Sequence, residues 1–202
     1  MNEKQQILVI HGGTAHKDYE SYLEALKNST PKLERILSRR DWKNELQDQL
    51  GEKYEVFTPN MPNKQNAQFD EWKILFEKIV DLLDDNFIVI GHSLGGIFLV
   101  KYLSENKVSK KIKKTHLLGT PFNNEEMVHE ELHSFLRKSD LNNLERQAGE
   151  LYFYHSEDDF AVQFSHLAKF QERLPTANFK TFKDRNHFMQ EKVPELIEDI
   201  KK

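Results

Sequence analysis

Short apolar runs alternate with segments of helical periodicity along this chain of 202 residues. The central runs are continuously apolar, a pattern typical of parallel strands that are covered on both faces. Between them, apolar residues recur every three or four positions, which predicts amphipathic helices. This alternation favours an α/β fold with a doubly wound parallel sheet and right-handed crossovers. The expected strands are Ile7–Ile10, Tyr54–Thr58, Phe87–Ile90, Thr115–Leu118, Leu151–Tyr154 and Phe179–Phe182.

Two connections between the expected strands are long. About 40 residues separate the first two strands and about 30 separate the fourth and fifth, well above the usual loop length. We interpret residues 15–40 and 121–148 as insertions on a single domain spanning residues 1–202, the second being a candidate small cap. Helix-like stretches are expected around Tyr19–Lys27, Leu33–Leu50 and Glu125–Lys138. The other predicted helical stripes are Trp42–Leu50, Phe69–Leu83, Ile97–Leu103, Phe164–Leu174 and Val193–Ile200.

The composition excludes several classes of protein. Apolar residues make up 38% of the chain, and 14 Phe, 6 Tyr and 2 Trp supply a core. A net charge of −4 gives no reason to expect nucleic acid or anionic membrane as a partner. The absence of cysteine rules out disulfides, thiolate metal sites and a cysteine nucleophile. The first apolar run is too short for a signal peptide or a membrane span, so we expect a cytoplasmic protein.

The segment Gly91-His92-Ser93-Leu94-Gly95 matches G-x-S-x-G, and it lies between an expected strand and an expected helix. That context is typical of a nucleophile elbow, where the chain turns sharply and holds the serine in strained backbone geometry. Side chains at Gly91 or Gly95 would clash across so tight a turn. The Ser93 hydroxyl would stand at a helix N-terminus, which favours developing negative charge. The alternative is a glycine-rich loop in which Ser93 has no chemical role.

A serine hydroxyl needs a base, and in this type of scaffold the acid and base follow the nucleophile in the chain. His187 is the only histidine after the sixth expected strand, so it is the candidate base. The fifth strand is followed by adjacent carboxylates at Asp158 and Asp159. Both loops lie at the carboxyl ends of strands, on the same edge of the sheet as Ser93. The residues alone leave the choice between the two aspartates open.

Four segments together resemble a known superfamily: HGG after the first strand, GHSLGG at the elbow, HSEDDFAV after the fifth strand and RNHF after the sixth. The chain looks like an α/β hydrolase and is similar to the small RBBP9/YdeN-like serine hydrolases. The resemblance implies a three-layer domain with about six parallel strands in the order 2-1-3-4-5-6 and helices on both faces. Its D-x-x-V register maps the triad acid onto Asp159. Phe160 and Gln163 stand where many members have proline, which keeps Asp158 as an alternative.

An oxyanion hole needs two N–H donors aimed at the tetrahedral oxygen. One is the backbone N–H of Leu94, the residue after the nucleophile. The other is expected from the loop His11-Gly12-Gly13; the resemblance implies Gly13, with Gly12 next. The alternative is a tight turn that needs glycine for its backbone alone. His92 and Met61, the latter in the segment after the second strand, are further candidates for the pocket wall.

The segment His129-Glu130-Glu131-Leu132-His133 matches H-E-x-x-H, the signature of zinc metallopeptidases. On a helix, His129 and His133 could hold zinc with Glu130 as the base. Both histidines lie at or beyond the border of the local apolar face, and no third ligand stands at a suggestive spacing. We therefore expect no metal there, and interpret the segment as a helical cover over the site or as a solvated helix.

The sequence thus predicts a serine hydrolase, carboxylesterase-like, that needs no cofactor. Ser93, His187 and Asp159 would cleave an ester-type bond, carboxylester or thioester, in a small-molecule acyl substrate through an acyl-enzyme. One alternative is a non-catalytic binding protein with the same fold. A zinc metallopeptidase using His129, Glu130 and His133 is a weaker one. Neither the acyl preference nor the oligomeric state can be read from the sequence.

Overall fold

The computed structural model describes residues 4–33, 37, 40–127 and 132–202, and its centre is a six-stranded sheet. All neighbouring strands pair in parallel, in the order β2-β1-β3-β4-β5-β6. This confirms the expected strands and their order. The strands are β1 (Gln5–Ile10), β2 (Tyr54–Phe57), β3 (Phe87–His92), β4 (Ile112–Leu118), β5 (Glu150–Ser156) and β6 (Asn178–Phe182).

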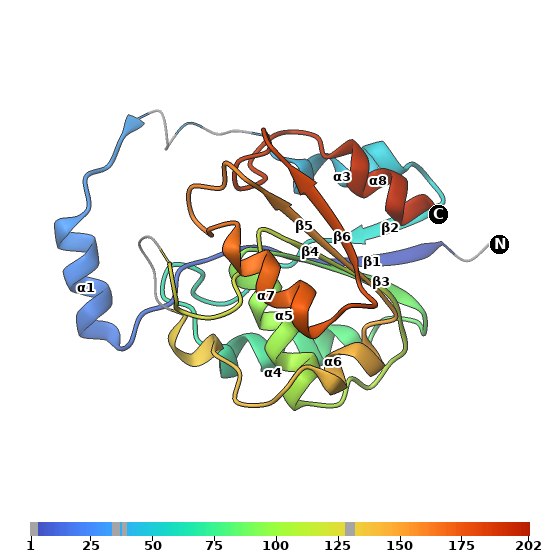
Figure 1. The fold of residues 1–202 in the computed structure, drawn as a ribbon, viewed down its shortest axis with the longest axis horizontal. Coiled ribbons are helices and arrows are strands. Elements are labelled where there is room, and N and C mark those ends of the chain that lie inside the picture. The colour runs from blue at the N-terminus through green and yellow to red at the C-terminus, as the bar shows by residue number, and fades with distance from the viewer. Residues whose placement is uncertain (1–3, 34–36, 38–39, 128–131) are drawn as a thin grey trace.

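Helices cover both faces of the sheet and produce three layers (Figure 1). Helices α3 and α8 lie on one face, and α4, α5, α6 and α7 lie on the other. Side chains alternate between these layers: in β1, Ile7 and Val9 pack with α3 and α8, whereas Leu8 and Ile10 pack on the opposite face. The helices are α1 (Tyr19–Asn28), α3 (Trp42–Leu50), α4 (Phe69–Val80), α5 (Leu94–Glu105), α6 (Asn142–Gln147), α7 (Ser165–Arg173) and α8 (Pro194–Lys201).

The first long connection differs in part from its prediction. Helix α1 forms where Tyr19–Lys27 was expected, and Asp18 caps it by accepting the Ser21 N–H. None of its residues is buried, and Figure 1 shows it standing apart from the layers, beyond the carboxyl ends of the strands. The stretch expected to be helical around Leu33–Leu50 is interrupted: residues 40 and 41 are not helical, and helix α3 begins at Trp42, because the Asp41 carboxylate accepts the first free N–H groups. At the start of the stretch Leu33 is helical, and its carbonyl accepts the Leu37 N–H at 3.1 Å. Part of that stretch, residues 34–36 and 38–39, lies outside the described residues.

The helix expected over Glu125–Lys138 is wrong in its described part. Met127 instead forms an antiparallel bridge with Val162, and only a single 3₁₀ turn, η1 (His133–Phe135), follows. Glu126 and His133 have φ values of 60° and 42°, which a right-handed helix cannot contain. The Lys101 ammonium, on α5, donates hydrogen bonds to the carbonyls of Ser134 and Leu136. These tertiary contacts override the helical spacing of the apolar residues.

None of the helices in the described part of the chain is long and apolar enough to cross a bilayer.

A buried polar network joins β4 and β5 to the C-terminal helix. The Tyr154 hydroxyl donates to Asp199 Oδ2 at 2.8 Å, so His116 Nδ1–H must be the donor in its 2.9 Å hydrogen bond with Tyr154. His116 Nε2 is then left with a lone pair, and it has no partner within the described residues. Burial is the main reason that the pKa of His116 falls to about 3. The folded protein therefore keeps this imidazole neutral.

This network generates a prediction about pH and stability. Because the pKa of His116 is lower in the folded state than the ordinary value of 6.5, the unfolded chain binds more protons as pH falls. Its contribution to stability is present above pH about 6.5 and is lost progressively below it. We expect His116→Phe to reduce the pH slope of the unfolding free energy by up to about 1.4 kcal/mol per pH unit between pH 6 and 4. Chemical denaturation across this range measures it, and equal slopes in the two proteins would contradict the assignment.

Candidate active site

Ser93 is the turning point between β3 and α5, and its backbone is strained. Its φ and ψ are 56° and −120°, a region that non-glycine residues rarely adopt. The Ser93 N–H donates to the Leu118 carbonyl at 2.9 Å, which ties the turn to the neighbouring strand β4. Every residue from Phe87 to Ser104 is buried except Ser93, which is partly exposed. The fold therefore presents one hydroxyl to solvent from an otherwise buried strand and helix.

The glycines beside Ser93 are required by close backbone approach, as expected from the sequence. A Cβ on Gly95 would lie 2.3 Å from the Ile10 carbonyl oxygen, at the end of β1. A Cβ on Gly91 would lie 2.7 Å from the Gly95 carbonyl oxygen. Contacts this short are not tolerated by real side chains, so the crossing of β1, β3 and α5 excludes any larger residue. Gly12 also lies close, since a Cβ there would be 3.1 Å from Ser93 Cβ.

A buried imidazole–carboxylate pair lies at the same edge of the sheet. His187 Nδ1 lies 2.8 Å and 3.0 Å from the two carboxylate oxygens of Asp159. The Asp159 side chain is fully buried, and its Oδ1 also accepts the N–H groups of Ala161 and Val162 at 2.9 Å each. Because a carboxylate accepts, Nδ1 carries the proton, and the lone pair of a neutral His187 is on Nε2.

Asp158 takes a different position from its neighbour. It is exposed, and its carboxylate accepts hydrogen bonds from the Ser156 hydroxyl and, at 2.8 Å, from the Asn186 N–H. The hydrogen bond from Ser156 is the main cause that lowers the pKa of the Asp158 carboxyl. Asp158 thus joins the loop after β5 to the loop after β6, while Asp159 is the carboxylate in contact with His187.

The loop that bears His187 is anchored from two other elements. His92 Nε2 is 2.8 Å from the His187 carbonyl oxygen, and since a carbonyl only accepts, Nε2 carries the proton. Burial lowers the pKa of His92 well below its ordinary value, so this donor stays neutral. The Trp42 indole N–H, from α3, donates to the Phe188 carbonyl at 3.0 Å, and the Trp42 backbone N–H donates to the Gln190 carbonyl at 3.0 Å. The rings of His92 and His187 lie 5.0 Å apart, centre to centre, which places the imidazole beside the elbow.

The loop after β1 is fixed by His11. Its Nε2 accepts the Met61 N–H at 2.8 Å, so Nδ1–H is the donor in its 2.6 Å hydrogen bond with the Gly12 carbonyl. Desolvation lowers the pKa of His11 and favours this neutral state. The Gly12 carbonyl is thereby held against His11, and the N–H of the same peptide plane, at Gly13, points the opposite way. Met61 itself is buried in the core, in the same cluster as Leu94.

The zinc hypothesis gains no support from the structure. His129 and Glu130 lie outside the described residues, and His133 has a left-handed φ of 42° at the start of the η1 turn. The second histidine is therefore not on the α-helix that H-E-x-x-H requires. Within residues 4–33, 37, 40–127 and 132–202, no group of three or more His, Asp or Glu side chains is arranged to hold a metal ion.

The sequence interpretation missed the anchoring role of Trp42. Its position in a helical stripe correctly predicts a buried residue, but its hydrogen-bond acceptor is 146 positions away in the chain. It also missed His155, at the end of β5, whose Nε2 donates to the Val162 carbonyl at 2.9 Å and lies 3.8 Å from Asp159 Oδ2. A buried histidine in a strand gives no local signal of these partners.

A six-stranded parallel sheet with a strained serine elbow and a buried histidine–aspartate pair defines the architecture of an α/β hydrolase. Residues 6–193 match the sequence profile of the alpha/beta hydrolase fold family, so the chain belongs to this family. No curated protein matches the sequence significantly.

Solved structures show the same fold. The ydeN gene product from B. subtilis has a TM-score of 0.70 at 15% identity, over 98% of this chain and 97% of that one. A putative YdeN-like hydrolase from Pectobacterium atrosepticum has a TM-score of 0.55 at 12% identity, covering 92% and 80% of the two chains. An esterase from Exiguobacterium antarcticum has a TM-score of 0.58 at 15% identity, covering 99% and 91%. At these identities the likeness shows the fold alone.

The anchoring of the His187 loop generates a prediction. Trp42→Phe keeps an aromatic ring but removes the N–H donated to Phe188. We expect the free energy of unfolding to fall by about 1–3 kcal/mol, since a buried carbonyl loses its donor. Hydrogen exchange should also accelerate at the Phe188 amide. Trp72→Phe is the matched control, because it removes a similar bond, to the Pro62 carbonyl at 2.8 Å, away from this loop. Equal exchange at Phe188 in both variants would contradict the anchoring role.

Proposed function

We propose that this protein is a serine hydrolase that cleaves an ester-type bond, carboxylester or thioester, in a small-molecule acyl substrate. The proposal depends above all on the buried pair of His187 and Asp159, whose imidazole lies 5.0 Å, ring centre to ring centre, from His92, the residue before the partly exposed Ser93. A hydroxyl in strained geometry, an imidazole with its free nitrogen available and a carboxylate that holds the other nitrogen form the arrangement needed for nucleophilic acyl transfer.

In the proposed reaction His187 Nε2 accepts the proton of Ser93 as its oxygen attacks the substrate carbonyl. Asp159 holds the Nδ1–H tautomer and stabilises the imidazolium that forms. The imidazolium then gives the proton to the leaving oxygen or sulfur, and the acyl group stays on Ser93. Water, deprotonated by His187, releases the acid. In the described part of the chain the Ser93 hydroxyl has no hydrogen bond, so its bond to Nε2 would form as substrate binds.

The developing oxyanion would be bound by the N–H groups of Leu94 and Gly13. Leu94 is the first residue of α5, so its N–H has no partner within the helix and adds to the positive helix end. The Gly13 N–H is directed away from His11, because the Gly12 carbonyl of the same peptide is bound there. The buried Met61 would form part of the wall behind this loop. These two donors need no rearrangement, which is what makes oxyanion stabilisation effective.

The nucleophile is tested by labelling. We expect a fluorophosphonate probe to label the protein and Ser93→Ala to abolish both labelling and hydrolysis of p-nitrophenyl acetate, because the variant lacks the hydroxyl that would form the covalent intermediate. Ser109→Ala, which removes an exposed hydroxyl hydrogen-bonded to Asp81, is the control and should keep both. An unlabelled wild-type protein would favour a non-catalytic binding protein instead, and a fully labelled Ser93→Ala variant would move the nucleophile elsewhere.

The adjacent carboxylates give a second, paired test. Asp159→Asn keeps the size of the side chain but favours the wrong tautomer of His187, so kcat should fall by about 10³–10⁴. Asp158→Asn should lower kcat by less than about tenfold, because the Asp158 carboxylate binds the Ser156 hydroxyl and the Asn186 N–H and so affects His187 only through the position of its loop. Steady-state kinetics on p-nitrophenyl acetate measures both. The reverse order of effects would make Asp158 the acid.

A further inference from the structure

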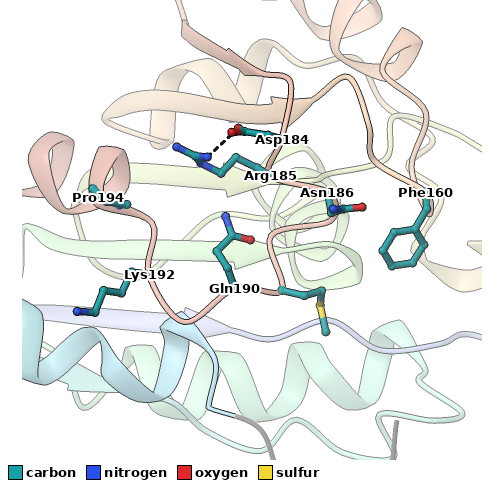
Figure 2. A pocket seen from close by; sticks show the side chains of 8 residues that line it. Phe160, Asp184, Arg185, Asn186, Gln190, Lys192 and Pro194 are labelled. Carbon is teal, nitrogen blue, oxygen red and sulfur yellow. Dashed lines mark hydrogen bonds and ion pairs between the residues drawn. The ribbon is translucent and has the colours of Figure 1, made fainter. Parts of the chain in front are cut away.

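A cavity of about 510 Å³ adjoins the loop that bears His187, and neither the triad nor the oxyanion hole uses it. Its walls are the loop after β5, at Phe160, and the connection from β6 to α8, from Asp184 to Pro194. Figure 2 shows Phe160 at one end of the cavity and Lys192 and Pro194 at the other, with Arg185 and Gln190 between them. Its volume lies in the range of small-molecule sites, about 300–1,000 Å³.

The end of the cavity nearest His187 carries two exposed apolar side chains and the amide of Asn186. Phe160 and Met189 are 60% and 58% exposed, and both line it. Phe160 directly follows Asp159, and Met189 comes two residues after His187. The rings of Phe160 and His187 lie edge to face, 6.0 Å between centres. Two large apolar side chains left in water beside the candidate base are typical of a surface that a substrate covers.

The position of His187 determines which part of the substrate reaches this cavity. When the tetrahedral intermediate collapses, the bond from the acyl carbon to the leaving oxygen breaks, and the proton on Nε2 passes to that oxygen. The alcohol part of the ester must therefore lie on the His187 side of the acyl carbon. The oxyanion lies on the other side, toward Gly13 and Leu94. A cavity lined by Phe160, whose ring lies 6.0 Å from that of His187, is placed to receive the alcohol part.

The charges around the cavity balance. Arg185 is bound to Asp184 and to Glu195, at 2.7 Å each, so its guanidinium is already satisfied by two carboxylates. Lys192 adds one positive charge, and the four groups together sum to zero. An anionic group would have to displace a carboxylate from Arg185 or depend on the exposed Lys192 alone, which is a weak attraction in water.

From this arrangement we propose that the cavity is the binding site for the alcohol part of the substrate, and that it selects uncharged, apolar alcohols through Phe160 and Met189. This inference rests on the proposed serine hydrolase function and adds to it the class of leaving group. The acyl part of the substrate would contact neither side chain.

The test compares acetate esters whose alcohols differ in length but little in acidity. We expect kcat/KM for hexyl acetate to exceed that for ethyl acetate by about tenfold or more, because each added methylene is removed from water. In the double variant Phe160→Ala/Met189→Ala this ratio should fall at least about fivefold. The ratio of ethyl hexanoate to ethyl acetate, which varies the acyl part, should change by less than about twofold. The acetate ester of ω-hydroxyhexanoate, which carries a negative charge, should be a poorer substrate than hexyl acetate.

Leu82→Ala is the matched control, since it removes another exposed apolar side chain, 83% exposed, in the connection between α4 and β3 at the opposite edge of the sheet. It should leave every ratio of kcat/KM values unchanged.

Fluorophosphonate labelling of each variant separates the alcohol-site proposal from the proposed hydrolase function. An unchanged hexyl-to-ethyl ratio in a fully labelled double variant would overturn the alcohol site and leave the hydrolase function standing. A preference for the anionic alcohol would also overturn it, whereas a wild-type protein that is not labelled would overturn both.

Discussion

The close approach of Gly95 to the carbonyl of Ile10 is the constraint on which the rest of the site depends. It lets α5 begin directly against the end of β1, which forces the chain to reverse at Ser93 with a left-handed φ. The strain at this residue is maintained because the residues on either side, from Phe87 to His92 and from Leu94 to Ser104, are buried and cannot relax. The same crossing brings the loop after β1 to Ser93, as the short distance from Gly12 shows. The Ser93 hydroxyl and the loop after β1 are thus positioned by a single packing contact.

His187 and Asp159 lie in the loops after β6 and β5, and these loops keep a fixed position because other elements hydrogen-bond to them. Three carbonyls of the segment that follows β6, at His187, Phe188 and Gln190, are each bound by a donor from elsewhere. Two of these donors belong to Trp42, so helix α3, in the long connection after β1, supports the candidate base. Asp158 adds a bond between the two loops. With the β6 loop anchored, the fully buried Asp159 can orient the imidazole without competition from water.

Patterns of apolar residues in the sequence correctly predicted the strands and helices that are stabilised by burying one continuous apolar run or face. Strands β1 and β3 followed from their apolar runs, and α4 followed from its stripe of Phe69, Trp72 and Phe76. The helix expected over Glu125–Lys138 failed for the opposite reason: its apolar spacing is real, but the Lys101 ammonium and the bridge from Met127 to Val162 fix a different backbone. The helical stretch expected around Leu33–Leu50 is interrupted at residues 40 and 41, because the Asp41 carboxylate caps the start of α3 there.

By itself the sequence determined the α/β class, the strand–turn–helix at Ser93 and the two loops that hold the remaining candidate residues, since each depends on neighbours within a few positions. The resemblance to a known superfamily supplied the strand order. Only the tertiary structure decided between Asp158 and Asp159 as the partner of His187, because adjacent side chains in a loop take directions that the surrounding elements impose. It alone revealed Trp42 as an anchor and the cavity beyond Phe160, since both join segments far apart in the chain. Contacts of that range follow from how layers pack, and no local pattern encodes them.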